Sequence, residues 1–276
     1  MQIPEKLKER LLKLGLDENI YEQRTRKCIL SREKLNLEKV PWFNDAYFVS
    51  DDFENKKDQF IFDPVSLVPC LALGPKKQDK ILDMCAAPGT KTFILSFLTN
   101  NEAKITANDI DKFRVKRLKA NVNKFNTSAE VFNLSGRKIK GGFNKILLDA
   151  PCSGEGMVNK KEKLFEHWSE KRVKILAKKQ KKLIQHAFEL LEKGGTLVYS
   201  TCTFEPEENE AVVDFLLTKF EDAVIDDVKI GNIVYDDGIV ELDNKKFNAG
   251  MRKCIRIYPN HDSTGGFFVA KIRKKA

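Results

Sequence analysis

Lys80-Ile-Leu-Asp83 is a short apolar run that leads directly into Met84-Cys-Ala-Ala-Pro-Gly-Thr-Lys-Thr92. The run predicts a β-strand, and the pattern of residues 91–98 predicts a helix. Small side chains between the two let the backbone approach a ligand closely, and the free N–H groups of the first helical turn favour an anionic group. This order of strand, small-residue turn and helix predicts the ligand-binding corner of an open α/β sheet.

Strands and helices continue to alternate after this corner. The sequence predicts strands at 104–108, 130–133, 145–149, 196–200 and 267–272, with helices at 111–125, 169–192 and 208–219. Ser169 is the expected N-cap of the long helix, and Gly194-Gly195 its expected end. This spacing indicates a mainly parallel sheet with helices on both faces, so the predicted fold class is α/β and doubly wound.

Residues 1–57 do not follow this rhythm. Met1–Leu16 is charged and amphipathic, and we interpret it as a short helix opened by Pro4 rather than as a targeting segment. A further strand is possible at 27–30. We therefore predict a small N-terminal α/β subdomain over 1–57 and a larger domain over 58–276. No run approaches the roughly 18 apolar residues of a membrane span, so we expect no membrane partner and a cytoplasmic location.

Charge points to an anionic partner. The chain has 49 basic and 40 acidic residues, a formal net charge of +9. Such a surplus favours nucleic acid, although a lysine-rich surface by itself is also compatible with simple solubility.

The six cysteines stand at 28, 70, 85, 152, 202 and 254 and form no Cys-x-x-Cys pair. A zinc ribbon or a thioredoxin-like site is therefore unexpected. Cys28, Cys70 and Cys254 suit buried packing. No metal is predicted, because no ligand spacing is present among the three histidines, His167, His186 and His261.

Two other kinds of nucleotide site are not supported. A P-loop needs an upstream glycine and an uninterrupted Gly-Lys-Ser/Thr, and here Thr90 separates Gly89 from Lys91. The G-x-G-x-x-G fingerprint is absent as well. Asp109 follows the strand 104–108, where an acid suits ribose hydroxyls. Its alternative role is a helix N-cap, which Asp111 could supply instead.

Two of the cysteines follow neighbouring predicted strands. Cys152 lies in Asp149-Ala-Pro-Cys-Ser-Gly-Glu-Gly156 after the strand 145–149, and Cys202 lies in Thr201-Cys-Thr203 after the strand 196–200. Because the carboxyl ends of parallel strands share one edge, both thiols should lie at one cleft beside the ligand-binding corner. One cysteine there could serve packing, but two are hard to explain in that way.

At these residues the chain resembles the RNA 5-methylcytosine methyltransferases of the RsmB/NOP (NOP2/Sun) family. The resemblance covers about residues 61–273. The segments that carry it are 62–67, 82–89 with Lys91-Thr92, 149–154, 200–203, 206–210 and 266–268.

The resemblance implies that 58–276 is a Rossmann-like methyltransferase domain with S-adenosyl-L-methionine (SAM) as cofactor and RNA as substrate. It implies that Cys202 is the nucleophile and that Cys152 assists release of the product. A thiolate that adds to C6 of cytosine makes the ring enamine-like, so that C5 can accept a methyl group. DNA cytosine-5 enzymes instead use a Pro-Cys-Gln motif, whereas this chain has Pro151-Cys-Ser153.

Further roles follow from the same resemblance. Asp149 is placed to hydrogen-bond the N3/N4 edge of the base. Lys91 would contact the base or lower a thiol pKa, unless it is a solvated helix residue. The expected cofactor contacts are Cys85, Ala86, Ala87, Pro88, Gly89, Lys91, Asp109, Arg114 and Asp149.

The chain departs from the family pattern at two places. Thr90 stands where the family usually has glycine, and Leu134-Ser-Gly-Arg137 stands where the family usually offers an aspartate to adenine. Because of these departures, the sequence does not identify the adenine contacts, and a lower SAM affinity than is usual in the family is compatible with them. Neither predicts inactivity.

An RNA base must be single-stranded or flipped out to reach such a cleft. Basic side chains near it could bind phosphates or form a solvated helix face; they are Lys160, Lys161, Lys163, Lys171, Arg172, Lys174, Lys178, Lys179, Lys181 and Lys182. Trp42, Phe43 and Tyr47 could stack on bases, although a role in the core of the small subdomain suits them better.

Compactness favours tRNA as the substrate and a monomer as the state, with rRNA as the alternative. A catalytically silent RNA-binding assembly factor and a small-molecule methyltransferase remain rival interpretations, which the cysteine pair and the basic surplus respectively disfavour.

Overall fold

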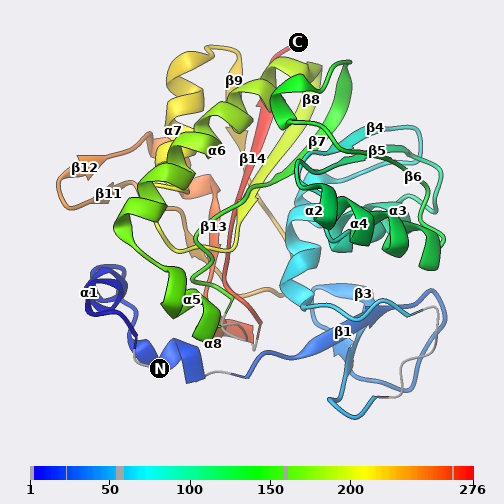
Figure 1. The fold of residues 1–276 in the computed structure, drawn as a ribbon, viewed down its shortest axis with the longest axis horizontal. Helices are drawn as coiled ribbons and strands as arrows, with labels where there is room; N and C mark the ends of the chain where they lie inside the picture. The colour runs from blue at the N-terminus through cyan, green and yellow to red at the C-terminus, as the bar shows by residue number, and fades with distance from the viewer. Residues whose placement is uncertain (1–2, 23, 54–58, 158–160, 263) are drawn as a thin grey trace.

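The computed structural model describes residues 3–22, 24–53, 59–157, 161–262 and 264–276. Within these residues the main sheet has nine strands in the order β10-β13-β14-β8-β7-β4-β5-β6, and β9 pairs with β14 (Figure 1). Five adjacent strands are parallel: β4 (Lys80–Asp83), β5 (Lys104–Asn108), β6 (Ala129–Phe132), β7 (Phe143–Asp149) and β8 (Leu191–Thr201). The predicted α/β fold class with a mainly parallel core is confirmed.

The remaining strands extend the sheet beyond β8 in antiparallel fashion. They are β9 (Ala223–Asp226), β10 (Asp236–Asp237), β13 (Ile255–Ile257) and β14 (Phe267–Lys274), and a separate hairpin joins β11 (Glu241–Leu242) to β12 (Lys245–Lys246). The sequence predicted β14, which is apolar over much of its length. It did not predict the others, because strands of two to four residues carry too little periodicity.

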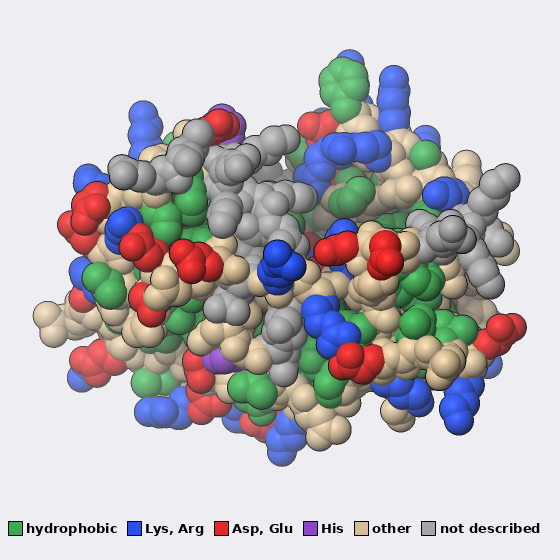
Figure 2. Space-filling view, turned by 90° about the horizontal axis from the view of Figure 1, so that it is seen from below, with side chains coloured by type: hydrophobic (Ala, Val, Ile, Leu, Met, Phe, Trp, Pro, Cys, Tyr) green, Lys and Arg blue, Asp and Glu red, His purple; other side chains and the backbone are tan. Residues whose placement is uncertain are grey.

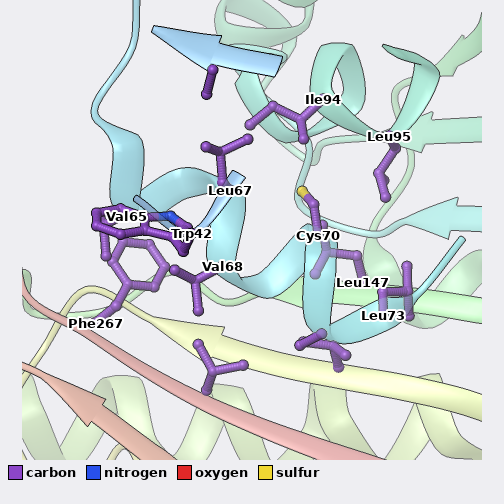
Figure 3. Close-up of a cluster of buried hydrophobic side chains, with 14 of the residues drawn as sticks. Trp42, Val65, Leu67, Val68, Cys70, Leu73, Ile94, Leu95, Leu147 and Phe267 are labelled. Atoms are coloured by element: carbon purple, nitrogen blue, oxygen red, sulfur yellow. The ribbon is translucent and has the colours of Figure 1, made fainter. Parts of the chain in front are cut away.

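Alternating side chains on the central strands bury both faces of the sheet. On β7, Leu147 packs into one hydrophobic cluster while Ile146 and Leu148 pack into another, and on β8 Val198 and Tyr199 divide in the same way. Helices cover each face: α2 (Leu67–Leu73) and α3 (Thr90–Leu98) contribute to the first cluster, and α6 (Glu170–Leu190) and α7 (Glu210–Lys219) to the second. Figure 1 shows α6 beside α7, and Figure 3 shows α2 within the first cluster.

Helix boundaries follow the predicted caps in two cases. Ser169 caps α6 by accepting from the Arg172 N–H, and Asp111 caps α4 (Lys112–Lys124) by accepting from two backbone N–H groups. The predicted end of α6 at Gly194-Gly195 is wrong. The helix ends at Leu190, because the next residue, Leu191, is already extended, and both glycines lie in β8.

The N-terminal elements comprise α1 (Glu5–Lys13), opened by Pro4, and a three-stranded antiparallel sheet in the order β1-β3-β2. The strands are β1 (Lys27–Leu30), β2 (Lys39–Val40) and β3 (Phe43–Val49), and the possible strand at 27–30 is thus confirmed. Two further short helices lie outside the N-terminal segment: α5 (Lys161–His167) and α8 (Pro259–Asp262).

These N-terminal elements pack against the rest of the chain. Leu7 of α1 belongs to one cluster with Trp168, whereas Trp42 and Phe48 belong to the cluster around α2 (Figure 3). Trp42 and Tyr47 are buried, so they serve the core, while Phe43 is half-buried. The predicted boundary at residue 57 lies outside the described residues, and a division into two domains stays a prediction.

Across the described ranges, no helix combines the length and apolar character that crossing a membrane requires.

Candidate active site

The two cysteines that follow β7 and β8 lie side by side. Asp149 at the end of β7 is opposite Ser200 of β8 in the parallel register, so the loops that leave both strands start at the same edge. The Sγ atoms of Cys152 and Cys202 are 3.2 Å apart, and both side chains are partly accessible. The structure therefore brings together the two thiols that the sequence placed at one cleft.

The environment of the two thiols differs. The pKa of Cys152 is raised well above its ordinary value, first by its hydrogen bond to Cys202 and then by burial. A raised pKa keeps the proton on Cys152, whose S–H is then available to donate toward the sulfur of Cys202. Cys152 is therefore suited to act as a hydrogen-bond donor beside Cys202.

Lys91 and Asp149 form an ion pair beside the sulfurs. The Lys91 Nζ is 2.9 Å from Asp149 Oδ2, and the Ser200 hydroxyl donates to Asp149 Oδ1 over 2.9 Å. The Lys91 ammonium also lies 4.8 Å from the centroid of the Phe267 ring. The carboxylate is thus held on both oxygens while its side chain stays 28% exposed toward the cleft.

Lys91 is buried, so the alternative of a solvated helix residue is wrong. Burial by itself would lower its pKa, but the Asp149 carboxylate outweighs burial and holds the pKa above the ordinary value. Lys91 therefore keeps its positive charge in a site of low polarity, where a charge acts more strongly than in water.

The loop between β4 and α3 forms the predicted ligand-binding corner. The Ala86 N–H donates to the Asn108 carbonyl over 2.7 Å, which ties the loop to the end of β5. Gly89 precedes α3 with a φ of 111°, a conformation that favours glycine, whereas Thr90 is already helical. The Thr90 departure from the family pattern therefore falls at a position that accepts a side chain.

Asp83 is a site residue that the sequence did not single out. It is fully buried at the end of β4; its Oδ2 accepts from the Thr92 hydroxyl over 2.7 Å, and its Oδ1 has no partner among the described protein atoms. Burial raises the pKa of Asp83 to about 7. The sequence did contain a signal for this residue, namely an acidic side chain at the end of a largely apolar strand. Its free oxygen suits a cationic group of a ligand.

Asp109 and Arg114 border the same corner. Asp109 Oδ2 accepts from the Ala87 N–H over 3.3 Å and lies 3.4 Å from Arg114 Nη1, and the Arg114 guanidinium also donates to the Ala87 carbonyl. Because Asp111 caps α4, the N-cap role proposed as the alternative for Asp109 is already taken. Asp109 Oδ1 accepts from the Asp111 N–H over 3.0 Å and the Asp109 side chain is 2% exposed, so a contact with ribose hydroxyls stays a prediction.

Cys85 is half-buried in this loop, and burial raises its pKa above the ordinary value of a thiol. A protonated thiol is a poor nucleophile. Cys85 is therefore not a candidate nucleophile, and contact with a cofactor is the role that stays predicted for it.

These groups fit SAM. The unpartnered Oδ1 of Asp83 suits an ammonium group, the first turn of α3 suits a carboxylate, and Asp109 suits a ribose. Residues 134–137, where the chain departs from the family pattern, are held near the end of β5 by the Asn108 side chain. This side chain donates to the Leu134 carbonyl and accepts from the Leu134 N–H. No carboxylate stands within 134–137 for adenine, as the sequence indicated.

The structure describes only some of the basic side chains that were predicted to contact phosphates. Lys160 and the side chains of Lys161 and Lys163 lie outside the described residues. On α6 the exposed basic residues are Lys171, Arg172, Lys174, Lys178, Lys179 and Lys182. Figure 2 shows basic and acidic side chains interspersed on the face seen from below, so that face carries no uniform basic patch among its described residues.

No group of His, Cys, Asp or Glu side chains that could hold a metal ion occurs in the part of the chain that the structure describes.

Comparison with known proteins identifies a family that this chain matches. Residues 70–273 match the family described as "16S rRNA methyltransferase RsmB/F". The tRNA (cytosine(49)-C(5))-methyltransferase of Pyrococcus abyssi is 38% identical over 89% of this chain and 82% of its own length. The ribosomal RNA small subunit methyltransferase F of Vibrio vulnificus is 36% identical over 87% of this chain, which spans about half (52%) of that relative.

Two solved structures share the fold across 99% of this chain. A methyltransferase homolog from Pyrococcus horikoshii has a TM-score of 0.80 with 27% identity and is covered over its full length. NSun6 from Pyrococcus horikoshii, crystallised with SFG, has a TM-score of 0.81 and is covered over 98% of its length; at 24% identity its likeness concerns the fold alone.

Proposed function

The chain belongs to the 16S rRNA methyltransferase RsmB/F family, and from this premise we propose that it is a SAM-dependent enzyme that methylates C5 of a cytosine in tRNA. Membership makes it an RNA methyltransferase, and relatives of this chain are named for cytosine-C5 methylation of tRNA or of 28S rRNA. The observation that carries the chemistry is the pair of thiols 3.2 Å apart beside the Lys91–Asp149 ion pair.

The choice of tRNA rests on the P. abyssi relative, which is 38% identical to this chain. The chain aligns with 82% of the P. abyssi relative that is named for cytosine 49 of tRNA, but with only 52% of the V. vulnificus relative named for ribosomal RNA. The rRNA relatives therefore contain long regions that this chain does not match. An rRNA substrate is the second candidate, favoured by the family description itself. A cytoplasmic location and a monomeric state stay predictions.

In the proposed reaction, Cys202 bonds covalently to C6 of the cytosine. SAM, when bound, supplies an electrophilic methyl group. The Sγ of Cys202 attacks C6 as a thiolate, and the electron pair of the C5–C6 double bond becomes available at C5. The Asp149 carboxylate accepts from the N4–H edge of the base, and the Lys91 ammonium offsets the negative charge that the thiolate brings into the site.

Release needs a proton to leave C5 and the carbon–sulfur bond to break. A base such as solvent water takes the proton from C5, the electron pair of the C5–H bond restores the C5–C6 double bond, and the electron pair of the C6–S bond returns to Cys202 as a thiolate. Cys152 assists this step from 3.2 Å away, because its S–H can stabilise the leaving sulfur.

Methylation of defined RNAs tests the function. The protein is incubated with labelled SAM and separately with unmodified tRNA and rRNA, and 5-methylcytosine is mapped by bisulfite sequencing. We expect one tRNA position to be methylated, whereas transfer to rRNA alone would establish the second candidate. Absence of label in both RNAs, with SAM binding intact, would refute the enzyme assignment.

The cofactor assignment predicts weaker SAM binding after Asp109→Ala. Loss of hydrogen bonds to a charged acceptor costs about 1.5–3 kcal/mol, which corresponds to roughly 10- to 100-fold in Kd. Calorimetric titration with SAM measures it, and circular dichroism checks the fold. Asp111→Asn is the matched control, because asparagine also caps helices, and its SAM affinity should equal that of the wild type. An unchanged Kd in Asp109→Ala would remove Asp109 from the site.

A further inference from the structure

A buried polar cluster joins the two loops that carry the thiols, and the proposed reaction does not use it. Its members are Ser153, Glu155, Thr203 and Glu208, all buried. We call these four residues the carboxyl cluster. Ser153 adjoins Cys152 and Thr203 adjoins Cys202, so the cluster lies one residue away from each sulfur-bearing residue.

Hydrogen bonds run through the cluster from one loop to the other. The Ser153 Oγ is 2.9 Å from Thr203 Oγ1 and 2.8 Å from Glu155 Oε2, and it is closer still to Glu208 Oε1. The Thr203 hydroxyl donates to the same Oε2 of Glu155. Any change in these contacts therefore shifts both cysteine loops together.

The hydroxyl groups of the cluster supply one proton fewer than its three contacts with carboxyl oxygens require. The Ser153 hydroxyl has one proton but contacts an oxygen of both Glu155 and Glu208, and the Thr203 proton is directed to Glu155. If both carboxyl groups were ionised, one oxygen would face the Ser153 oxygen with no proton between them. Such a buried, unpaired contact is strongly unfavourable.

The remaining donors indicate which carboxyl group holds the proton. Glu155 accepts from the Trp168 indole on Oε1 and from two hydroxyls on Oε2, which suits an ionised group. Glu208 Oε2 accepts from Gln180 Nε2 over 2.6 Å and from the Ser153 N–H over 3.1 Å. Its Oε1 contacts the Ser153 hydroxyl, so Oε1 can carry a proton that is donated to Ser153.

We propose that a proton on Glu208 Oε1, donated to Ser153 and through Ser153 linked to ionised Glu155, positions the Cys152 and Cys202 loops for the reaction. Glu208 and Glu155 are thus positioning residues, and this proposal rests on the proposed function. When the proton is lost, two buried anions flank one serine hydroxyl, and the hydrogen bonds that connect the loops weaken.

Burial raises the pKa of both carboxyl groups, but the hydrogen bonds that Glu155 accepts oppose the rise in its pKa, which agrees with this assignment. Burial raises the pKa of Glu208 to about 8, and the charge of Glu155 adds to the rise. The nearby cation Arg10 of α1 is engaged by Glu205 over 2.7 Å and by Glu207, so it does not neutralise the cluster. Burial raises the pKa of Glu205 to about 7.

The other groups that face the cluster supply no positive charge among the described residues. Tyr199 of β8 donates its hydroxyl to the Glu208 carbonyl, and its pKa is raised by burial. The pKa of Tyr21 is likewise raised by burial, with Glu155 contributing, and Glu208 contributes to the raised pKa of Cys152.

Two isosteric variants are expected to have opposite effects on methylation. In Glu208→Gln the amide donates to Ser153 where the acid did, and its oxygen accepts from Gln180, so the loops should keep their positions. In Glu155→Gln an amide replaces a group that only accepts, so one of its donors loses its acceptor. We expect Glu208→Gln to retain methylation and Glu155→Gln to lose it by at least about tenfold.

The pH dependence of covalent complex formation separates positioning from general destabilisation. The complex with tRNA is trapped at a series of pH values in two proteins, Cys152→Ala alone and Cys152→Ala combined with Glu208→Gln. Cys202 is present in both proteins, so dividing one rate by the other removes the pH dependence that its ionisation contributes. Above about pH 8 the rate of the protein that keeps Glu208 should fall relative to that of the combined variant, by up to about tenfold per pH unit.

Two measurements on the free protein do not depend on RNA. The infrared carbonyl band of protonated carboxylic acids should be weaker in Glu208→Gln than in the wild type at about pH 7.5; Asp83 and Glu205, whose pKa values are about 7, contribute to both proteins and cancel in the difference spectrum. A raised pKa in the folded state means that the stability of the wild type relative to Glu208→Gln falls as pH rises from about 4.3, the usual pKa of glutamate, to about 8, and is level above it.

The outcomes are distinct. Loss of activity in Glu208→Gln with retention in Glu155→Gln would place the proton on Glu155, and an unchanged pH ratio with no change in the infrared band would refute the proposal. If the infrared and stability results hold but no RNA is methylated, the proposed function fails while the shared proton stands. If Glu155→Gln does not fold, Glu208→Gln alone decides.

Discussion

Cys202→Ala is expected to abolish methylation, with turnover lowered by about four orders of magnitude or more, as removal of a catalytic nucleophile does. Without a sulfur at C6, the cytosine ring cannot gain nucleophilic character at C5. The measurement is transfer of label from SAM to tRNA together with a denaturing gel that detects covalent protein–RNA complexes. Both product and complex should disappear.

The control for Cys202→Ala is a buried thiol outside the site. Cys254 is fully buried in the hydrophobic cluster around α7 and takes no part in the proposed chemistry. Cys254→Ala should lower stability by about 1 kcal/mol through lost packing and leave turnover close to that of the wild type. A covalent complex formed by Cys202→Ala would exchange the roles of the two cysteines.

Cys152→Ala is expected to give the opposite phenotype, an accumulated covalent RNA complex. Cys202 can still attack C6, but the leaving sulfur loses the S–H that lies 3.2 Å away. Loss of a group that assists proton transfer costs about 10²- to 10⁴-fold, so turnover should fall by that range while the complex persists on a denaturing gel. Mass spectrometry would locate the attached nucleotide on the peptide that contains Cys202.

The double variant supplies the control for trapping. Cys152→Ala combined with Cys202→Ala must form no complex, because the bond to C6 comes from Cys202. Rapid turnover by Cys152→Ala without trapping would show that another group assists release. Asp149 and Lys91 would then be the nearest alternatives, since they pair with each other at the same cleft.

Much of the fold was predictable from local patterns. Lys80–Asp83 and Lys104–Asn108 were predicted with the bounds that the structure shows, because each has apolar residues in its interior between polar ends. The end of α6 was mispredicted, since Gly194-Gly195 resembles a helix stop although the chain is already extended at Leu191. The short strands β10 to β12 hold only two residues each, too few for any periodic signal.

The sequence by itself determined the α/β class, the ligand-binding corner after β4 and the two cysteines at the ends of adjacent strands. These features depend on apolar periodicity, on small residues in turns and on the rule that parallel strands end at one edge. The proximity of the thiols followed from strand order, without knowledge of side-chain positions.

Only the tertiary structure decided which partner each polar group has. Residues far apart in the chain meet there: Lys91 with Asp149, Arg10 with Glu205, and Ser153 with Glu208. Burial and the supply of protons to such groups depend on all the elements that surround them, and no local pattern encodes that sum. For the same reason the free oxygen of Asp83 and the proton shared in the carboxyl cluster became apparent only in the folded chain.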